Sequence, residues 1–211
     1  MATRTFQQVV TGSDELRELV GEPLELSLRK QLSSLDQHCR AFIARSPFLL
    51  IGTSNASGRG DVSPKGDPPG FVQVLDDRTL MIPDRPGNRR LDSLLNILEN
   101  PQVGLLFLVP GVEETLRVNG RATIVRDEEL LETAIVNGKR PHLAIVVEVQ
   151  EAFIHCAKAL KRSHLWDHDS QVERGELPSM AQMMMDQASP SDCTIDELEE
   201  RIEESYKTRL Y

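Results

Sequence analysis

The stretch that decides the fold is GDVSPKGDPPGFVQVLDDRTLMIPDRPGNRRLDSLLNILENPQVGLLF, residues 60–107. It alternates extended segments with tight turns, and the extended segments are residues 60–65, 71–75, 78–82 and 102–109. Asp76-Asp77 joins two of these segments and predicts a hairpin. The loop at 66–70 holds two prolines, which exclude it from a central strand. Leucines recur at helical spacing from Leu91 to Leu98, and they predict a helix before the last strand.

The flanking sequence adds further strands, and it adds helices near both ends of the chain. The other predicted strands are residues 48–53, 115–125 and 142–149. Apolar residues three and four apart predict one N-terminal helix over 24–45. A capping box from Thr194 to Glu197 predicts an acidic C-terminal helix over 193–208. About six short strands with helices at the corners indicate a mainly β fold, a small closed barrel, within one domain over 1–211.

Composition limits the classes of partner. The chain has 211 residues and a net charge of -9, which disfavours binding to nucleic acid because that binding depends on neutralising phosphates. The longest apolar runs are too short to cross a membrane, and the first residues lack the apolar core of a signal peptide. Three widely spaced cysteines argue against a disulfide framework. We therefore expect a cytoplasmic protein that binds neither nucleic acid nor membranes.

Two adjacent arginines, Arg89 and Arg90, follow Asn88 just before the predicted helix. Arginine is disfavoured at a helix N-terminus by the helix dipole, so two in a row there indicate that an anion binds nearby. Guanidinium groups bind phosphate oxygens bidentately, and the free N–H groups of a helix start attract the same anion. The residues themselves therefore predict a site for a phosphorylated ligand.

The order of these elements resembles the pyridoxamine 5'-phosphate oxidase-like family of FMN-binding split barrels, over about residues 40–165. The resemblance rests on the strand at Asp61–Lys65, the Gly87–Arg90 loop, Asn100-Pro101 and the strand Val103–Phe107. It implies a split β-barrel of Greek-key type and a homodimer that holds FMN at the subunit interface. The residues it places at the cofactor are Asp61, Val62, Ser63, Lys65, Ile82, Pro83, Asn88, Arg89, Arg90 and Thr115.

A second cluster lies later in the chain. Lys158 and Arg162 are four residues apart and share a helical face, and Trp166 follows one turn later. Two cations beside an aromatic ring suit a phosphate or a flavin. The resemblance implies that this region reaches the cofactor of the partner subunit. His164 and His168 have the spacing of two metal ligands, but no second pair accompanies them, so we expect no metal.

These features predict an FMN-dependent oxidoreductase that acts on a small-molecule substrate. No residue pattern demands a catalytic acid or base. Two alternatives stay open at this point. One is a reductase of the same fold that uses the deazaflavin cofactor F420, and the other is a non-catalytic protein that binds flavin or heme. The sequence does not rank Lys65 against Lys158 as the lysine nearer to the flavin ring.

Overall fold

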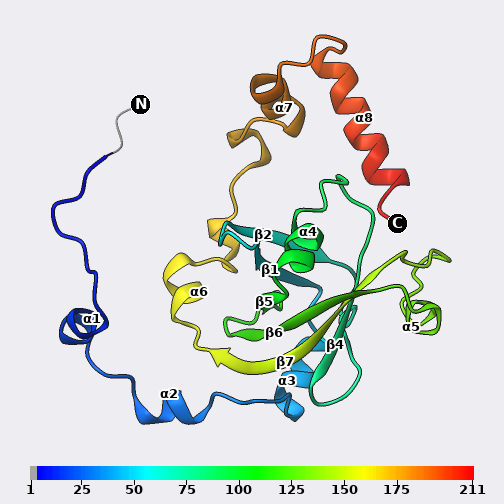
Figure 1. The fold of residues 1–211 in the computed structure, drawn as a ribbon. Helices are drawn as coiled ribbons and strands as arrows, with labels where there is room; N and C mark the ends of the chain where they lie inside the picture. Colours follow the sequence, from blue (N-terminus) through cyan, green and yellow to red (C-terminus); the bar gives the residue numbers. More distant parts are fainter. Residues whose placement is uncertain (1–3) are drawn as a thin grey trace.

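Seven antiparallel strands form one sheet in the order β2-β1-β5-β6-β7-β4-β3 (Figure 1). The structure is a computed structural model, and it describes residues 4–211. The strands are β1 (Phe48–Ser54), β2 (Gly60–Gly66), β3 (Gln73–Val74), β4 (Thr79–Pro83), β5 (Gln102–Leu108), β6 (Thr115–Val125) and β7 (Ala144–His155). Within the described residues, the edge strands β2 and β3 do not pair with each other. The barrel is therefore split between them rather than closed, and the predicted mainly β split-barrel class is confirmed.

The helices flank the barrel and extend from it at both ends of the chain. They are α1 (Ser13–Val20), α2 (Glu25–Arg29), α3 (Gln37–Ile43), α4 (Asp92–Glu99), α5 (Glu128–Glu132), α6 (Lys158–Ser163), α7 (Met180–Ala188) and α8 (Ile195–Thr208). Two short 3-10 helices, η1 (His168–Ser170) and η2 (Arg174–Glu176), precede α7. Figure 1 shows α1 and α2 on an arm away from the barrel, and α7 packed against α8 outside it. None of the helices in residues 4–211 is both long and apolar enough to span a membrane.

The single N-terminal helix predicted over 24–45 is wrong, because the segment forms two helices, α2 and α3. The chain between them is extended at Leu32, whose N–H donates to the carbonyl of Ala152 on β7 at 3.0 Å. Asp36 then starts α3 by accepting a hydrogen bond from the N–H of Cys39 at 2.8 Å. Pairing with β7 therefore overrides the helical spacing of the apolar residues. The C-terminal helix forms as α8, with both hydrogen bonds of its capping box present.

The core fills the concave side of the sheet. Leu49 and Ile51 of β1, Ile82 of β4 and Phe107 of β5 are fully buried there. Strand β2 lies at the edge, and its residues alternate between the two sides. Its proline, Pro64, is tolerated because an edge strand has one side free of a partner. This alternation places Asp61, Ser63 and Lys65 on the less exposed side of the strand.

A register shift bends the long β6–β7 pair between Asn119 and Gly120. A Cβ atom at Gly120 would lie 2.2 Å from the carbonyl oxygen of Glu148 on β7. No side chain fits at this distance, so the close approach of the two strands requires glycine.

Candidate functional site

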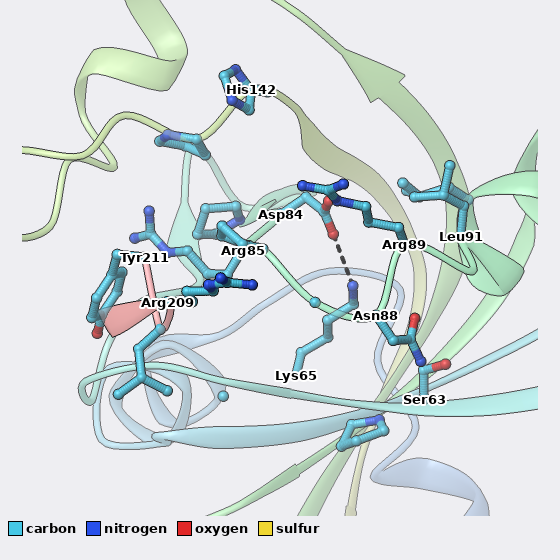
Figure 2. A pocket seen from close by; sticks show the side chains of 18 of the residues that line it. Ser63, Lys65, Asp84, Arg85, Asn88, Arg89, Leu91, His142, Arg209 and Tyr211 are labelled. Atoms are coloured by element: carbon cyan, nitrogen blue, oxygen red, sulfur yellow. Dashed lines mark hydrogen bonds and ion pairs between the residues drawn. The ribbon is translucent and has the colours of Figure 1, made fainter. Parts of the chain in front are cut away.

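A pocket of about 1110 Å³ opens at the split of the barrel. It is larger than the ~300–1,000 Å³ of typical ligand sites. Six parts of the chain line it: β2, Phe71 in the loop after β2, the end of β4 with the loop from β4 to α4, the start of α4, residues 139–142, and the segment around the end of α8. Figure 2 shows that their charged side chains gather on one side of β2. The split therefore brings together residues that are far apart in the sequence.

Two ion pairs cross the split. The Nζ atom of Lys65 lies 2.9 Å from Oδ1 of Asp84, and both side chains are largely buried (Figure 2). Nε of Arg85 donates to Oδ2 of Asp67 at 2.6 Å, and one of its terminal nitrogens donates to the carbonyl of Ala134 at 2.9 Å. The Asp67 side chain is 1% exposed, and Arg85 provides the opposite charge beside it. The charges of Lys65 and Arg85 are therefore largely compensated within the protein.

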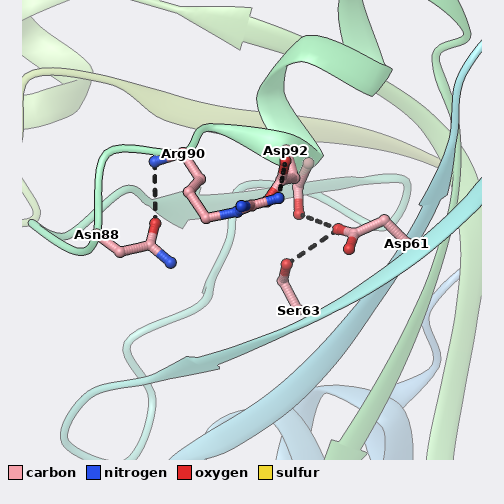
Figure 3. Close-up of polar contacts among 6 residues, drawn as sticks. Asp61, Ser63, Asn88, Arg90 and Asp92 are labelled. Atoms are coloured by element: carbon pink, nitrogen blue, oxygen red, sulfur yellow. Dashed lines mark hydrogen bonds and ion pairs between the residues drawn. The ribbon is translucent and has the colours of Figure 1, made fainter. Parts of the chain in front are cut away.

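The loop before α4 carries two non-glycine residues with left-handed backbones. Arg89 has φ 60° and Leu91 has φ 61°. Each such residue costs on the order of 1 kcal/mol or more, and strain of this kind concentrates at ligand sites. The side chain of Asn88 holds the turn by accepting the N–H of Arg90 at 2.9 Å (Figure 3). The predicted phosphate loop therefore has a defined and strained conformation.

The two predicted arginines differ in their partners. Nε of Arg90 donates to Asp92 at 2.8 Å, and this hydrogen bond raises the pKa of Arg90 (Figure 3). Within residues 4–211, Arg89 has no ion-pair partner and no side-chain hydrogen bond, and it lines the pocket. The available cation at this loop is therefore Arg89, while Arg90 binds a carboxylate of its own helix.

The pocket is positively charged although the chain is acidic overall. Its cationic lining residues are Lys65, Arg85, Arg89, Lys139, Arg140 and Arg209, and its carboxylates are Asp84 and Asp92. This excess of positive charge in a chain of net charge -9 favours an anionic ligand.

Of the β2 residues predicted to contact the cofactor, some line the pocket and others do not. Ser63 and Lys65 line the pocket. Asp61 lies on the same side, and it accepts hydroxyl hydrogen bonds from Ser63 at 3.1 Å and from Ser93 at 3.3 Å (Figure 3). Val62 lies on the opposite side and is 65% exposed. Asp61 therefore joins β2 to α4, and Val62 does not reach the pocket within one chain.

Among the other predicted cofactor residues before residue 120, some line the pocket and some do not. Pro83 and Asn88 line the pocket. Ile82 is 0% exposed and packs in the core, so its side chain is not available to a ligand. Thr115 is buried at the start of β6, where it pairs with His155 of β7, and it is not among the lining residues.

The second predicted cluster, Lys158, Arg162 and Trp166, lies apart from the pocket. Lys158 and Arg162 are exposed on α6, and Nε1 of Trp166 donates to the carbonyl of Val112 at 2.9 Å. None of the three lines the pocket of the same chain. The side chain of His164 contacts Asp167 at 2.7 Å. In the part of the chain that the structure describes, no group of three or more metal-ligating side chains occurs.

Several residues that line the pocket were not predicted from the sequence. They are Asp84, Lys139, Arg140, His142, Arg209 and Tyr211. Each is an ordinary polar residue in its local sequence, and only the path of the chain brings it to the split. The one available signal was the basic pair Lys139-Arg140 directly after a turn glycine, Gly138.

Residues 35–156, more than half of the chain, match the family model described as pyridoxamine 5'-phosphate oxidase. None of the curated proteins compared with the sequence matches it. HupZ of Group A Streptococcus is a similar solved structure, with 20% identity, a TM-score of 0.46, and coverage of 57% of this chain and 93% of HupZ. A putative pyridoxamine 5'-phosphate oxidase from Lactobacillus delbrueckii is 21% identical, with a TM-score of 0.45 and coverage of 59% and 98%. The heme storage protein HutZ from Vibrio cholerae is 19% identical, with a TM-score of 0.41 and coverage of 57% and 94%.

The family assignment rests on the sequence match, and the split barrel described above is the fold that it predicts. The chain belongs to the pyridoxamine 5'-phosphate oxidase-like family.

Proposed function

We propose that the protein is an FMN-dependent oxidoreductase of the pyridoxamine 5'-phosphate oxidase-like type that acts on a small-molecule substrate. The observation that carries the proposal is the position of Arg89. It is a guanidinium with no acidic partner within residues 4–211, on a strained loop that faces Ser63 and Lys65 across one pocket. Family membership supports the choice of a flavin.

The lining residues fit the parts of FMN. Arg89 and the amide of Asn88 provide donors for the phosphate, and the nearby start of α4 adds its helix dipole. Phe71, Pro83 and Leu94 provide apolar walls for a ring system. When bound, the flavin supplies two-electron transfer, and the protein holds and tunes it. Lys65 would place a cation near the ring, with its charge moderated by Asp84.

The proposal includes a homodimer with the flavin at the subunit interface. Lys158, Arg162 and Trp166 lie outside the pocket of their own chain, so any contact they make with the cofactor comes from the partner subunit. The pocket is open at the split, which leaves one side of a ligand there for a second chain to cover.

The first test is retention of FMN after loading and desalting, measured by absorption. The wild-type protein is expected to retain FMN, and the Arg89→Ala/Arg90→Ala double variant is expected to lose it. Riboflavin, which lacks the phosphate, should bind both proteins equally. The control is Arg121→Ala/Arg126→Ala, which makes the same charge change at exposed positions outside the pocket. Equal FMN affinity in the double variant and the control would overturn the phosphate assignment.

A second measurement separates an enzyme from a binding protein. Anaerobic addition of NADH or NADPH to the loaded protein should bleach the flavin band with saturable kinetics. A flavin that neither donor reduces would favour a carrier or sensor. A heme Soret band, or retention of F420 in preference to FMN, would replace the cofactor in this proposal. A dimer with bound flavin in sedimentation analysis would support the subunit arrangement.

A further inference from the structure

The segment at the end of α8 forms one wall of the pocket. Helix α8 lies outside the barrel, but the chain turns back at its end toward the loop that joins β4 to α4 (Figure 1). The lining residues from this segment are Ser205, Tyr206, Arg209, Leu210 and Tyr211. This part of the chain lies beyond the matched residues 35–156, so the family model assigns nothing to it.

Tyr211 fastens the segment to the barrel. Its hydroxyl donates to Oδ1 of Asp67 at 2.7 Å, and Arg85 holds the other oxygen of the same carboxylate. The guanidinium carbon of Arg85 lies 5.4 Å from the centre of the Tyr211 ring, within cation–π range. Nζ of Lys139 donates to the carbonyl of Tyr211 at 3.4 Å. Three barrel residues therefore hold one tyrosine.

This attachment places Arg209 in the pocket. Lys65, Arg85 and Arg140 each have a carboxylate partner in the protein, and Lys139 contacts a carbonyl. Within residues 4–211, Arg209 has no ion-pair partner and no side-chain hydrogen bond. Figure 2 shows its guanidinium directed into the group of charged side chains, beside that of Arg85. Arg89 and Arg209 are thus the two pocket guanidinium groups without a carboxylate, and they come from opposite parts of the chain.

We propose that Arg209 binds the phosphate group of the pocket ligand together with Arg89, and that Tyr211 latches the segment that carries Arg209. For FMN as the ligand, this rests on the proposed function. Two unpaired guanidinium groups match the charge of a phosphate monoester, and each can bind two of its oxygens. Tyr211 acts as a positioning residue. Its hydroxyl donates to Asp67, and it is Arg209 that binds the ligand.

The test is a calorimetric titration with inorganic phosphate, FMN and riboflavin. Arg209→Ala is expected to weaken phosphate and FMN binding by about tenfold or more, the usual effect of losing a hydrogen bond between charged groups. Riboflavin affinity should stay unchanged. Arg201→Ala is the matched control, because it removes the same charge from an exposed position on α8 that does not line this pocket. Tyr211→Phe keeps the ring but loses the hydroxyl, and it should cause a smaller loss of FMN affinity than Arg209→Ala.

The outcomes separate this inference from the proposed function. Unchanged phosphate and FMN affinity in Arg209→Ala, with wild-type binding intact, would overturn the role of Arg209 alone. A wild-type protein that binds phosphate through Arg209 but not FMN would overturn the FMN proposal and support the inference. A wild-type protein that binds neither would overturn both. Equal losses in Arg209→Ala and Arg201→Ala would show a general charge effect and would also overturn the role of Arg209.

Discussion

Lys65 and Asp84 form an ion pair across the opening of the barrel, with 2.9 Å between Nζ and Oδ1. Lys65 lies on β2 at one edge of the sheet, and Asp84 directly follows β4 near the other edge. The pair lies in the pocket wall, so it both joins the two sides of the split and sets the local charge.

Replacing the two members should change FMN affinity in opposite directions. Lys65→Met leaves the Asp84 carboxylate uncompensated beside an anionic ligand, and FMN affinity should fall by about tenfold, equivalent to ~1.4 kcal/mol. Asp84→Asn releases the charge of Lys65, and affinity should rise. Fluorescence titration of each variant measures both effects. A change in the same direction in both variants, or no change in either, would contradict the proposed effect of this charge pair on FMN affinity.

Arg89 and Arg90 should contribute unequally to FMN affinity. Arg89 is free to bind a ligand, whereas Arg90 must first leave Asp92. Arg89→Ala should therefore reduce FMN affinity more than Arg90→Ala does, and Asp92→Asn should bring the contribution of Arg90 closer to that of Arg89. FMN titrations of the three variants measure this. A larger loss in Arg90→Ala would show that Arg90 changes its partner when the ligand binds.

Ile82→Ala should affect stability and leave cofactor affinity unchanged. Its side chain is 0% exposed in the core, so truncation should lower the free energy of unfolding by about 2–5 kcal/mol. Urea denaturation of the unliganded protein measures the first effect, and FMN titration at low temperature measures the second. A variant of unchanged stability with weakened FMN binding would instead show that Ile82 contributes to the cofactor site.

Gly120→Ala should be among the most damaging small substitutions in the barrel. The added methyl group would lie 2.2 Å from the carbonyl oxygen of Glu148, a backbone atom fixed by the β6–β7 pairing. We expect a loss of about 3 kcal/mol or more, at the upper end for overpacked sites. Gly52→Ala is the matched control, because its added methyl group would make an ordinary 3.6 Å contact with Gly104. Comparable melting temperatures for the two variants would contradict the steric argument.

The three cysteines should differ sharply in reactivity. Burial raises the pKa of Cys39 to about 11, whereas Cys156 is exposed. At pH 8, mass spectrometry should find alkylation at Cys156 and none at Cys39 in the folded protein. As the pH rises from about 9 toward 11, the unfolded chain loses a thiol proton that the folded protein keeps, so Cys39 should make the free energy of unfolding fall. Cys39→Ala should reduce this slope, and an unchanged slope would contradict it.

Much of the barrel could be predicted from the sequence because the strands are short, apolar and separated by strong turn residues. The strand predicted over 115–125 forms with the same bounds as β6, and the predicted helix that starts near Leu91 forms as α4. The helix over 24–45 failed because helical spacing does not reveal that Leu32 pairs with β7. Local patterns predict local structure, and a long-range backbone pairing leaves no local pattern.

The place of the Gly87–Arg90 loop at the pocket could be predicted because its charges are adjacent in the sequence. The rest of the site could not, since the contact of Tyr211 with Asp67 joins residues 144 positions apart. Ile82 shows the opposite difficulty, because a residue one position before a lining residue, Pro83, points into the core. The alternation of a strand decides such cases, and it requires the register of the sheet.

Pro64 has a consequence for how the protein behaves at high concentration. It stands in the middle of β2, the edge strand beside the pocket, and it carries no N–H. An incoming strand from another molecule would lack one donor at the centre of this edge, so edge-to-edge association is disfavoured. We therefore expect Pro64 to disfavour strand-to-strand association of barrels through this edge.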